Sequence, residues 1–71
     1  MSSTIVVKRD SLRTWQSMKG WSDERLAREI GVSHAMLSHV MNGIRNPGNK
    51  FIAGLLSVSQ CPFEAFFHVK N

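Results

Sequence analysis

The sequence predicts an all-α fold: a compact domain of five short helices, whose two chain ends can add a small two-stranded sheet. Two observations lead to this prediction. Apolar residues recur at spacings of three and four, the period of an amphipathic helix. Serine or another capping residue precedes several of these stretches, and glycine follows them, as at the two ends of a helix. The length of 71 residues predicts a single domain over residues 1–71, with its core at about 10–67.

The first two predicted elements are a short strand and a helix. Residues 4–8 are rich in β-branched side chains, which favour a strand. Asp10 or Ser11 can cap the helix that follows, and Gly20 can end it. A stripe of apolar residues at spacings of three is expected to pack inside. It consists of Leu12, Trp15 and Met18.

Two short helices with a tight turn between them are predicted next. Ser22 caps the first, which ends at Gly31, and Ser33 caps the second, which runs from about His34 to Asn42. Two such helices joined by a tight turn form a helix-turn-helix unit. The side chains expected to hold them together are Leu26, Ala27, Ile30, Val32, Leu37, Val40 and Met41.

The last part of the chain predicts two more helices and a strand. The fourth helix begins near Asn49 or Lys50, and Gly54 within it suggests close packing, because glycine weakens a helix by ~1 kcal/mol relative to alanine. Pro62 suits the start of a short fifth helix that runs to about Phe67. The apolar residues of the fourth helix are Phe51, Ile52, Leu55 and Leu56.

The two ends of the chain are expected to pair with each other. Residues about 66–70 alternate like a strand and can pair antiparallel with residues 4–8, on the side away from the third helix. The alternative is that residues 1–9 are disordered in solution. Exchange of the backbone amides of residues 5–7 would distinguish these two interpretations.

Composition narrows the class of function. Nine Lys and Arg against five Asp and Glu give a formal net charge of +4, which suits a polyanion such as nucleic acid. The lone Cys61 is expected to be a buried thiol in a reducing cytoplasm, and no apolar stretch approaches the ~20 residues that a membrane helix needs. His34 and His39 are five residues apart, which does not suit a metal pair. We find no catalytic motif and expect no enzyme activity, cofactor, metal or small-molecule ligand.

Residues 20–47 resemble the lambda-repressor/Cro-like (XRE-type) helix-turn-helix family of phage and bacterial regulators. The most recognisable positions are the Leu26-Ala27 pair, the Gly31-Val32-Ser33 turn and the Asn42-Gly43 ending, followed by Arg45-Asn46-Pro47. The resemblance extends over about residues 10–67. It implies a sequence-specific DNA-binding transcriptional regulator, a repressor of the Cro type, with residues about 33–42 as the recognition helix in the major groove.

The resemblance also implies roles for single residues. Contacts with base edges are implied for His34, Ala35, Met36, Ser38 and His39. Phosphate contacts are implied for Ser33, Asn42, Arg45, Asn46 and Lys50. Because residues 33–42 contain no Lys or Arg, groove affinity is expected to come from flanking cations. These flanking cations are Arg13, Lys19, Arg25, Arg45 and Lys50. Phosphate contacts are implied for Lys19 and Arg25 as well.

The expected partner is double-stranded DNA with a palindromic operator, bound by a homodimer. Exposed side chains among Phe63, Phe66 and Phe67 would offer the dimer patch. Gln16 and Met41 stand where many family members carry an ion pair, so we expect apolar packing in its place. Asp23 at a phosphate-facing position and the uncharged third helix keep a second hypothesis open. In that hypothesis the chain is a protein-interaction module, anti-repressor or antitoxin-like, that modulates another DNA-binding protein.

Overall fold

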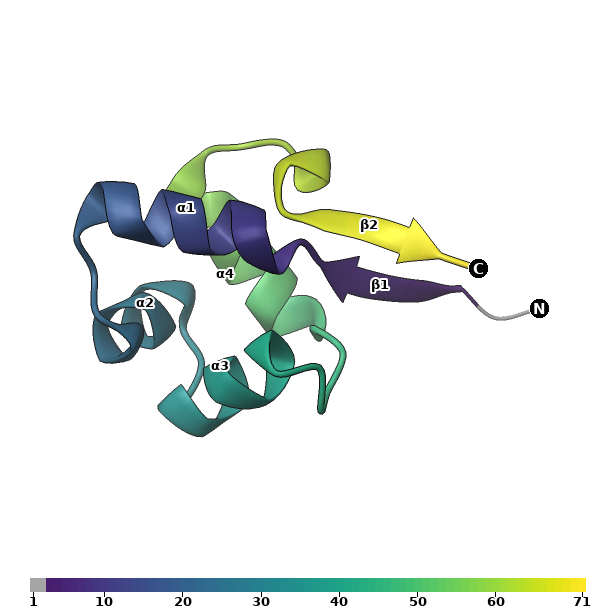
Figure 1. Cartoon of the computed structure of the whole chain (residues 1–71), viewed down its shortest axis with the longest axis horizontal. Helices are drawn as coiled ribbons and strands as arrows, with labels where there is room; N and C mark the ends of the chain where they lie inside the picture. Colours follow the sequence, from purple (N-terminus) through teal and green to yellow (C-terminus); the bar gives the residue numbers. More distant parts are fainter. Residues whose placement is uncertain (1–2) are drawn as a thin grey trace.

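The computed structural model describes residues 3–71, which form four α-helices, one 3-10 turn and a two-stranded sheet (Figure 1). The helices gather in one body, and the two strands project from it together as a ribbon (Figure 1). None of the helices in this part of the chain is long and apolar enough to cross a membrane. The order is β1 (Thr4–Val7), α1 (Arg9–Lys19), α2 (Asp23–Ile30), α3 (His34–Met41), α4 (Asn49–Ser59), the 3-10 turn η1 (Phe63–Ala65) and β2 (Phe67–Lys70).

The two central helices begin and end where their capping residues predict. The Ser22 hydroxyl accepts a hydrogen bond from the Arg25 backbone N–H at 3.1 Å, and the Ser33 hydroxyl accepts one from the Met36 N–H at 3.0 Å. Gly31 takes φ of +95°, a left-handed conformation that glycine adopts without steric cost. This conformation ends α2 and turns the chain directly into α3.

The core lies between the inner faces of all four α-helices and the base of the ribbon. The predicted inner faces of α2 and α3 are confirmed as buried. Close packing at Gly54 is also confirmed, because a Cβ built there would lie 1.8 Å from the Ile30 carbonyl oxygen. The buried apolar residues are Val7, Leu12, Leu26, Ala27, Ile30, Leu37, Val40, Met41, Phe51, Leu55, Phe66 and Phe67.

The predicted stripe of α1 is wrong at its last position. Met18 is 80% exposed, whereas Gln16 is only 7% exposed. Each residue turns an α-helix by about 100°, so a spacing of three drifts back by about 60° at every step. Met18 therefore lies about 120° from the Leu12 direction, and Gln16 only about 40°. Gln16 therefore lies on the inner face of α1, although its side chain is polar.

The predicted antiparallel pairing of the two chain ends is confirmed. Thr4 faces Lys70 and Val7 faces Phe67, and the Lys8 N–H extends the ladder to the Phe66 carbonyl at 2.6 Å. The disorder considered for residues 1–9 does not apply to this strand, and residues 1 and 2 lie outside the described residues.

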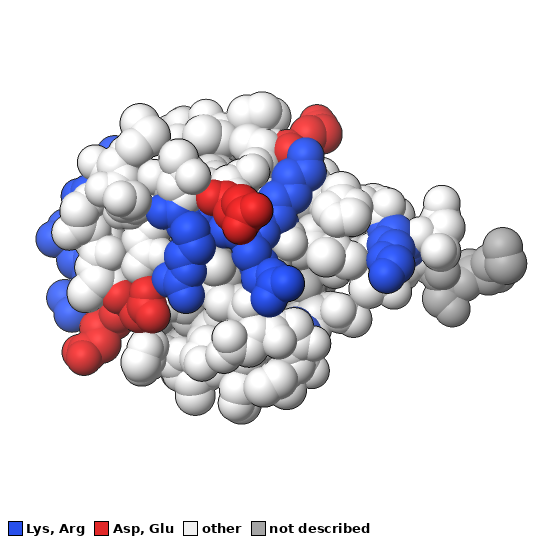
Figure 2. All heavy atoms as spheres, viewed as in Figure 1, with Lys and Arg blue, Asp and Glu red and all other residues white. Residues whose placement is uncertain are grey.

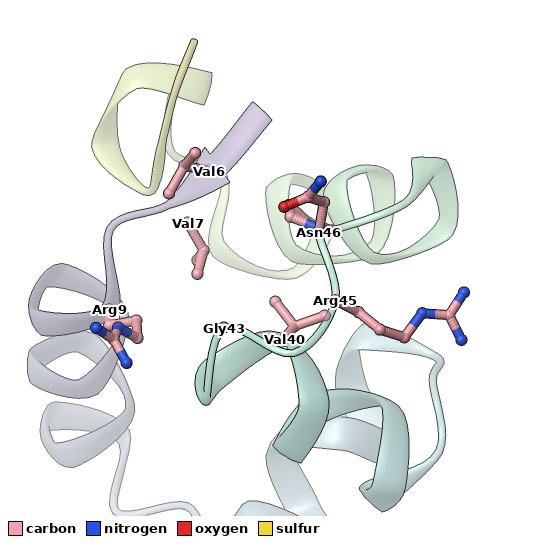
Figure 3. A pocket seen from close by; sticks show the side chains of 8 residues that line it. Val6, Val7, Arg9, Val40, Gly43, Arg45 and Asn46 are labelled. Carbon is pink, nitrogen blue, oxygen red and sulfur yellow. The ribbon is translucent and has the colours of Figure 1, made fainter. Parts of the chain in front are cut away.

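The predicted place of the ribbon is wrong, because it does not lie away from α3. Val6 and Val7 share a hollow of about 120 Å³ with Val40 and with residues 43–47, the loop that follows α3 (Figure 3). Only Lys8 separates β1 from α1, so the strand must end where α1 starts. The Arg9 guanidinium there donates to the Met41 carbonyl at 3.1 Å, which brings this point to the end of α3.

The predicted fifth helix is also wrong, because only the 3-10 turn η1 forms before β2. Phe66 and Phe67 are 3% and 1% exposed, so two successive side chains are both buried. The Phe66 carbonyl already accepts the hydrogen bond from Lys8. The backbone groups that a longer helix would use for its own hydrogen bonds are therefore engaged in pairing with β1.

Candidate nucleic-acid interface

Helix α3 presents its first turns to solvent. His34, Ala35 and His39 are exposed, while Met36 and Ser38 are partly buried. The helix packs inward through three residues of its other face, Leu37, Val40 and Met41. The five residues predicted to contact bases therefore include three that are open to a ligand and two at the edge of that open surface.

The two edge residues are held by their surroundings. The Met36 side chain packs partly against the core. The Ser38 hydroxyl accepts a hydrogen bond from the Asn42 side-chain amide at 3.2 Å and keeps its own hydrogen to donate. Met36 and Ser38, at the edge of the exposed face of α3, are therefore both held in place by neighbouring side chains.

The predicted phosphate residues after α3 are exposed. Asn42, Arg45, Asn46 and Lys50 all lie at the surface, as does Ser33 at the start of the helix. Figure 3 shows the Arg45 side chain pointing away from the hollow beside Val40. Within residues 3–71, neither Arg45 nor Lys50 forms a salt bridge. Their charges are therefore available to an anionic partner.

Lys19 and Arg25, also predicted to contact phosphates, are instead gathered around indole rings. The Lys19 ammonium lies 5.8 Å from the Trp15 ring centre and 6.0 Å from that of Trp21. The Arg25 guanidinium lies 5.1 Å from the Trp21 ring and pairs with Glu29 at 3.2 Å. Both cations thus have partners within the protein, which sequence reasoning did not anticipate.

A hydrogen-bonded polar triad, formed by Arg13, Gln16 and Asp23, links α1 to the start of α2. Arg13 Nη1 donates to the side-chain oxygen Oε1 of Gln16 and to the Asp23 carboxylate, each at 2.7 Å. The Gln16 amide donates to Asp23 at 2.7 Å and to the Trp21 backbone carbonyl at 3.1 Å. These bonds satisfy the polar atoms of the Gln16 side chain, which is almost fully buried.

The polar triad corrects a prediction made from the sequence. Apolar packing was expected at Gln16, but its amide forms hydrogen bonds instead; only Met41 joins the apolar core. The hydrogen bond from Gln16 and then that from Arg13 lower the pKa of the Asp23 carboxyl. The charge of His34, the first residue of α3, acts in the same direction. A polar residue at a core position of α1 was the sequence signal for this arrangement.

The charges flank α3 and do not lie on it. Figure 2 shows Lys, Arg and acidic side chains mixed over the middle of the molecule, whereas the lower surface, where Figure 1 places α3, carries neither sign of charge in this view. A ligand on α3 would meet imidazole, hydroxyl and methyl groups at the centre, with cations around them.

Two other predicted or conceivable sites are not formed. The dimer patch expected from the C-terminal phenylalanines is wrong, because Phe66 and Phe67 are buried and Phe63 stacks on Phe67 at 5.2 Å. Phe66 and Phe67 are held inside because the ribbon closes over the core. Over residues 3–71, His, Cys, Asp and Glu side chains form no group of three that could hold a metal ion.

Comparisons with known proteins identify the family of the chain. A helix-turn-helix family model matches residues 12–66, which is more than half of the chain. An uncharacterised HTH-type transcriptional regulator of Bacillus subtilis (strain 168), YvzC, is 39% identical over 64 residues, covering 90% of this chain and 83% of that protein. No solved structure gives a significant match.

Proposed function

Because the chain belongs to the XRE-type helix-turn-helix family, we propose that it is a DNA-binding transcription regulator that reads sequence with α3 in the major groove. The observation that carries this proposal is the open surface at the start of α3, formed by His34, Ala35 and His39. In this geometry the first helix of the unit crosses the DNA backbone and the second directs its N-terminal side chains at base edges.

The chemistry of the exposed residues suits base recognition. An imidazole of His34 or His39 can donate to guanine N7 or O6, and the Ala35 methyl can pack on a thymine methyl. Ser38 keeps a hydroxyl hydrogen for a base acceptor, and Met36 flanks the groove with an apolar edge. We assign base contacts to these five residues.

Phosphate contacts are proposed on both sides of this surface. Ser33, Asn42, Asn46, Arg45 and Lys50 are exposed and can position the protein on the backbone. The family prediction extends to Lys19 and Arg25. We expect smaller contributions from these two, since each would have to leave or share its aromatic partner.

The finer form of the proposal is a sequence-specific repressor of the phage or bacterial Cro type that acts in the cytoplasm. It rests on the resemblance of residues 20–47 to that family. A homodimer on a palindromic operator is part of the same proposal, because two half-sites one helical turn apart would add avidity to a modest single contact.

A protein-interaction module that modulates another DNA-binding protein is the second candidate. The observation in its favour is the absence of Lys and Arg from α3. Asp23 no longer supports it strongly, because Arg13 neutralises this carboxylate at 2.7 Å. The two candidates differ in salt dependence: DNA binding weakens steeply with salt through counterion release.

The test is DNA binding measured on sites selected from a random pool, with a scrambled duplex beside them. Arg45→Ala is expected to weaken binding to all sequences, whereas His39→Ala is expected chiefly to reduce the preference for the selected site, by about 1–3 kcal/mol. The matched control is His68→Ala, because His68 is an exposed histidine on β2 and lies outside the proposed contacts. It should change neither the affinity nor the preference for the selected site. Equal losses on every sequence for both test variants would contradict these roles.

A further inference from the structure

We propose that the polar triad of Arg13, Gln16 and Asp23 forms a DNA phosphate-binding site, in which Arg13 contacts the phosphate and the other two position it. The inference rests on the proposed function and extends it to the start of α2. It reverses the role expected of Asp23, which is a positioning residue for a cation rather than a repulsive group facing the backbone.

The geometry fixes the Arg13 guanidinium before any ligand arrives. Nη1 alone makes the bonds to Gln16 and Asp23, both at 2.7 Å. Gln16 is in turn anchored to the Trp21 carbonyl at 3.1 Å and is buried. A guanidinium has five N–H donors in a rigid fork, so most of its donors stay free for the two oxygens of a phosphate. Arg13 itself is about half exposed.

The position of the triad is next to the proposed reading surface. Asp23 is the first residue of α2 and His34 is the first residue of α3. In a helix-turn-helix unit the first helix crosses the DNA backbone, and α2 is that helix here. Arg13, bonded to Asp23, therefore lies at the start of the helix that would cross the backbone, whereas Arg45 follows the C-terminal end of α3.

The supply of cations points to Arg13 for this end of the site. A duplex on α3 needs positive charge on both flanks, because the helix has no Lys or Arg of its own. Beyond the C-terminal end, Arg45 and Lys50 are available. On the other flank, Lys19 and Arg25 are held on indole rings, and Arg25 is also paired with Glu29. Arg13 is also paired with a carboxylate, that of Asp23, but its guanidinium is held by the Gln16 side chain as well, and its own side chain stays about half exposed.

Asp23 acts on Arg13 in two opposing ways. Its charge reduces the attraction of the site for an anion, and its hydrogen bond removes conformational freedom that Arg13 would otherwise lose on binding. A simple repulsive role predicts that removing the carboxylate strengthens DNA binding. A positioning role predicts the opposite, provided that Arg13 is present. The sign of this effect separates the two roles.

The first measurement is the salt dependence of binding to a fluorescein-labelled duplex of mixed sequence, ~30 base pairs or about three helical turns long. Arg13→Gln should make the slope of log K against log salt shallower by about 0.9, the value for one neutralised phosphate, and weaken binding roughly five- to ten-fold at 0.1 M salt. Lys70→Gln removes the same charge from the exposed end of the ribbon and is the matched control. Its slope should stay that of the unmodified protein.

The second measurement is a double-mutant cycle between Arg13 and Asp23. Asp23→Ala is expected to weaken binding two- to five-fold in the unmodified background and to strengthen it in the Arg13→Gln background, where the carboxylate has no cation to orient. Asp23→Asn keeps an oxygen acceptor for Arg13 and should retain more affinity than Asp23→Ala. Circular dichroism of each variant at the assay temperature establishes that the compared proteins are folded; if the alanine variant is not, Asp23→Ser, which also removes the carboxylate, replaces it in the cycle.

The outcomes separate this inference from the proposed function. An unmodified protein that shows no salt-dependent DNA binding would overturn both. An unmodified protein that binds DNA, with a slope unchanged by Arg13→Gln, would overturn the phosphate site alone. Tighter binding by Asp23→Ala in the unmodified background would overturn the positioning role of Asp23.

Discussion

At the scale of single residues, Gly54 shows how one missing side chain allows two helices to meet. In α4 this residue faces the last residue of α2, and a Cβ there would lie 1.8 Å from the Ile30 carbonyl oxygen. Separations below 3.0 Å essentially never occur for real Cβ atoms, so the backbones would have to move apart. Helix propensity alone favours alanine by ~1 kcal/mol, which makes the sign of a substitution informative.

We therefore predict that Gly54→Ala destabilises the protein by about 1–3 kcal/mol, as in an overpacked core, despite the better helix propensity of alanine. Urea unfolding followed by circular dichroism measures this difference. Gly48→Ala is the control, because a Cβ at position 48 meets no atom within 4 Å. It should cost less than about 1 kcal/mol, the usual range for a helix-capping position. Equal effects of the two substitutions would contradict the packing argument.

At the scale of elements, α2 and α3 are built alike but are expected to differ in use. Each has eight residues, a serine whose hydroxyl accepts the N–H three residues later, and one face in the core. Short isolated helices are marginal in water, so these caps and the packed faces keep both helices in place. Only α3 carries the proposed base contacts, and Ser33 stands next to them.

The two serines form a matched pair for separating stability from binding. Ser22→Ala and Ser33→Ala are each expected to cost ~1 kcal/mol of unfolding free energy, because each removes one helix cap. Ser33→Ala should additionally weaken DNA binding under conditions where both variants are fully folded, since the proposal places its hydroxyl at a phosphate. Thermal melts and fluorescence anisotropy on the same samples give the two quantities. Indistinguishable DNA affinities would remove Ser33 from the proposed contacts.

At the scale of the whole molecule, the Lys, Arg, Asp and Glu side chains lie around α3 and not on it. The net charge of +4 lies around an uncharged α3, while the ribbon and the C-terminal phenylalanines close the core beside it. The large apolar side chains that stay exposed in residues 3–71 are Met18, Ile44 and Val69. A single reading surface of this size suits one half-site, so the proposed dimer would supply the second.

We predict that sites selected from a random DNA pool are two-fold symmetric, with half-site centres about one helical turn (~34 Å) apart. Sedimentation of the protein with such a duplex should give two chains per duplex, and a duplex with one half-site scrambled should bind much more weakly because the avidity is lost. An asymmetric selected site that takes one chain would refute the dimer while leaving DNA binding intact.

The positions of α2 and α3 followed from local chemistry, which the sequence contains in full. Ser22, Ser33 and Gly31 define the helix-turn-helix unit through their own hydroxyls and backbone freedom, so its bounds were predictable. Its inner faces followed from the helical period. Once Leu37, Val40 and Met41 are assigned to the buried face of α3, the opposite face must be exposed. His34, Ala35 and His39 lie on that exposed face.

Tertiary structure alone decided the rest, because those features depend on residues that are distant in the chain. The fifth helix is lost because Phe66 pairs with Lys8, which lies near the other end of the chain. The pairing of Asp23 with Arg13 across two helices likewise follows no local rule. Whether Arg13 is free for DNA is therefore set by the partner that the packing of α1 against α2 brings near it, and sequence spacing does not encode that distance.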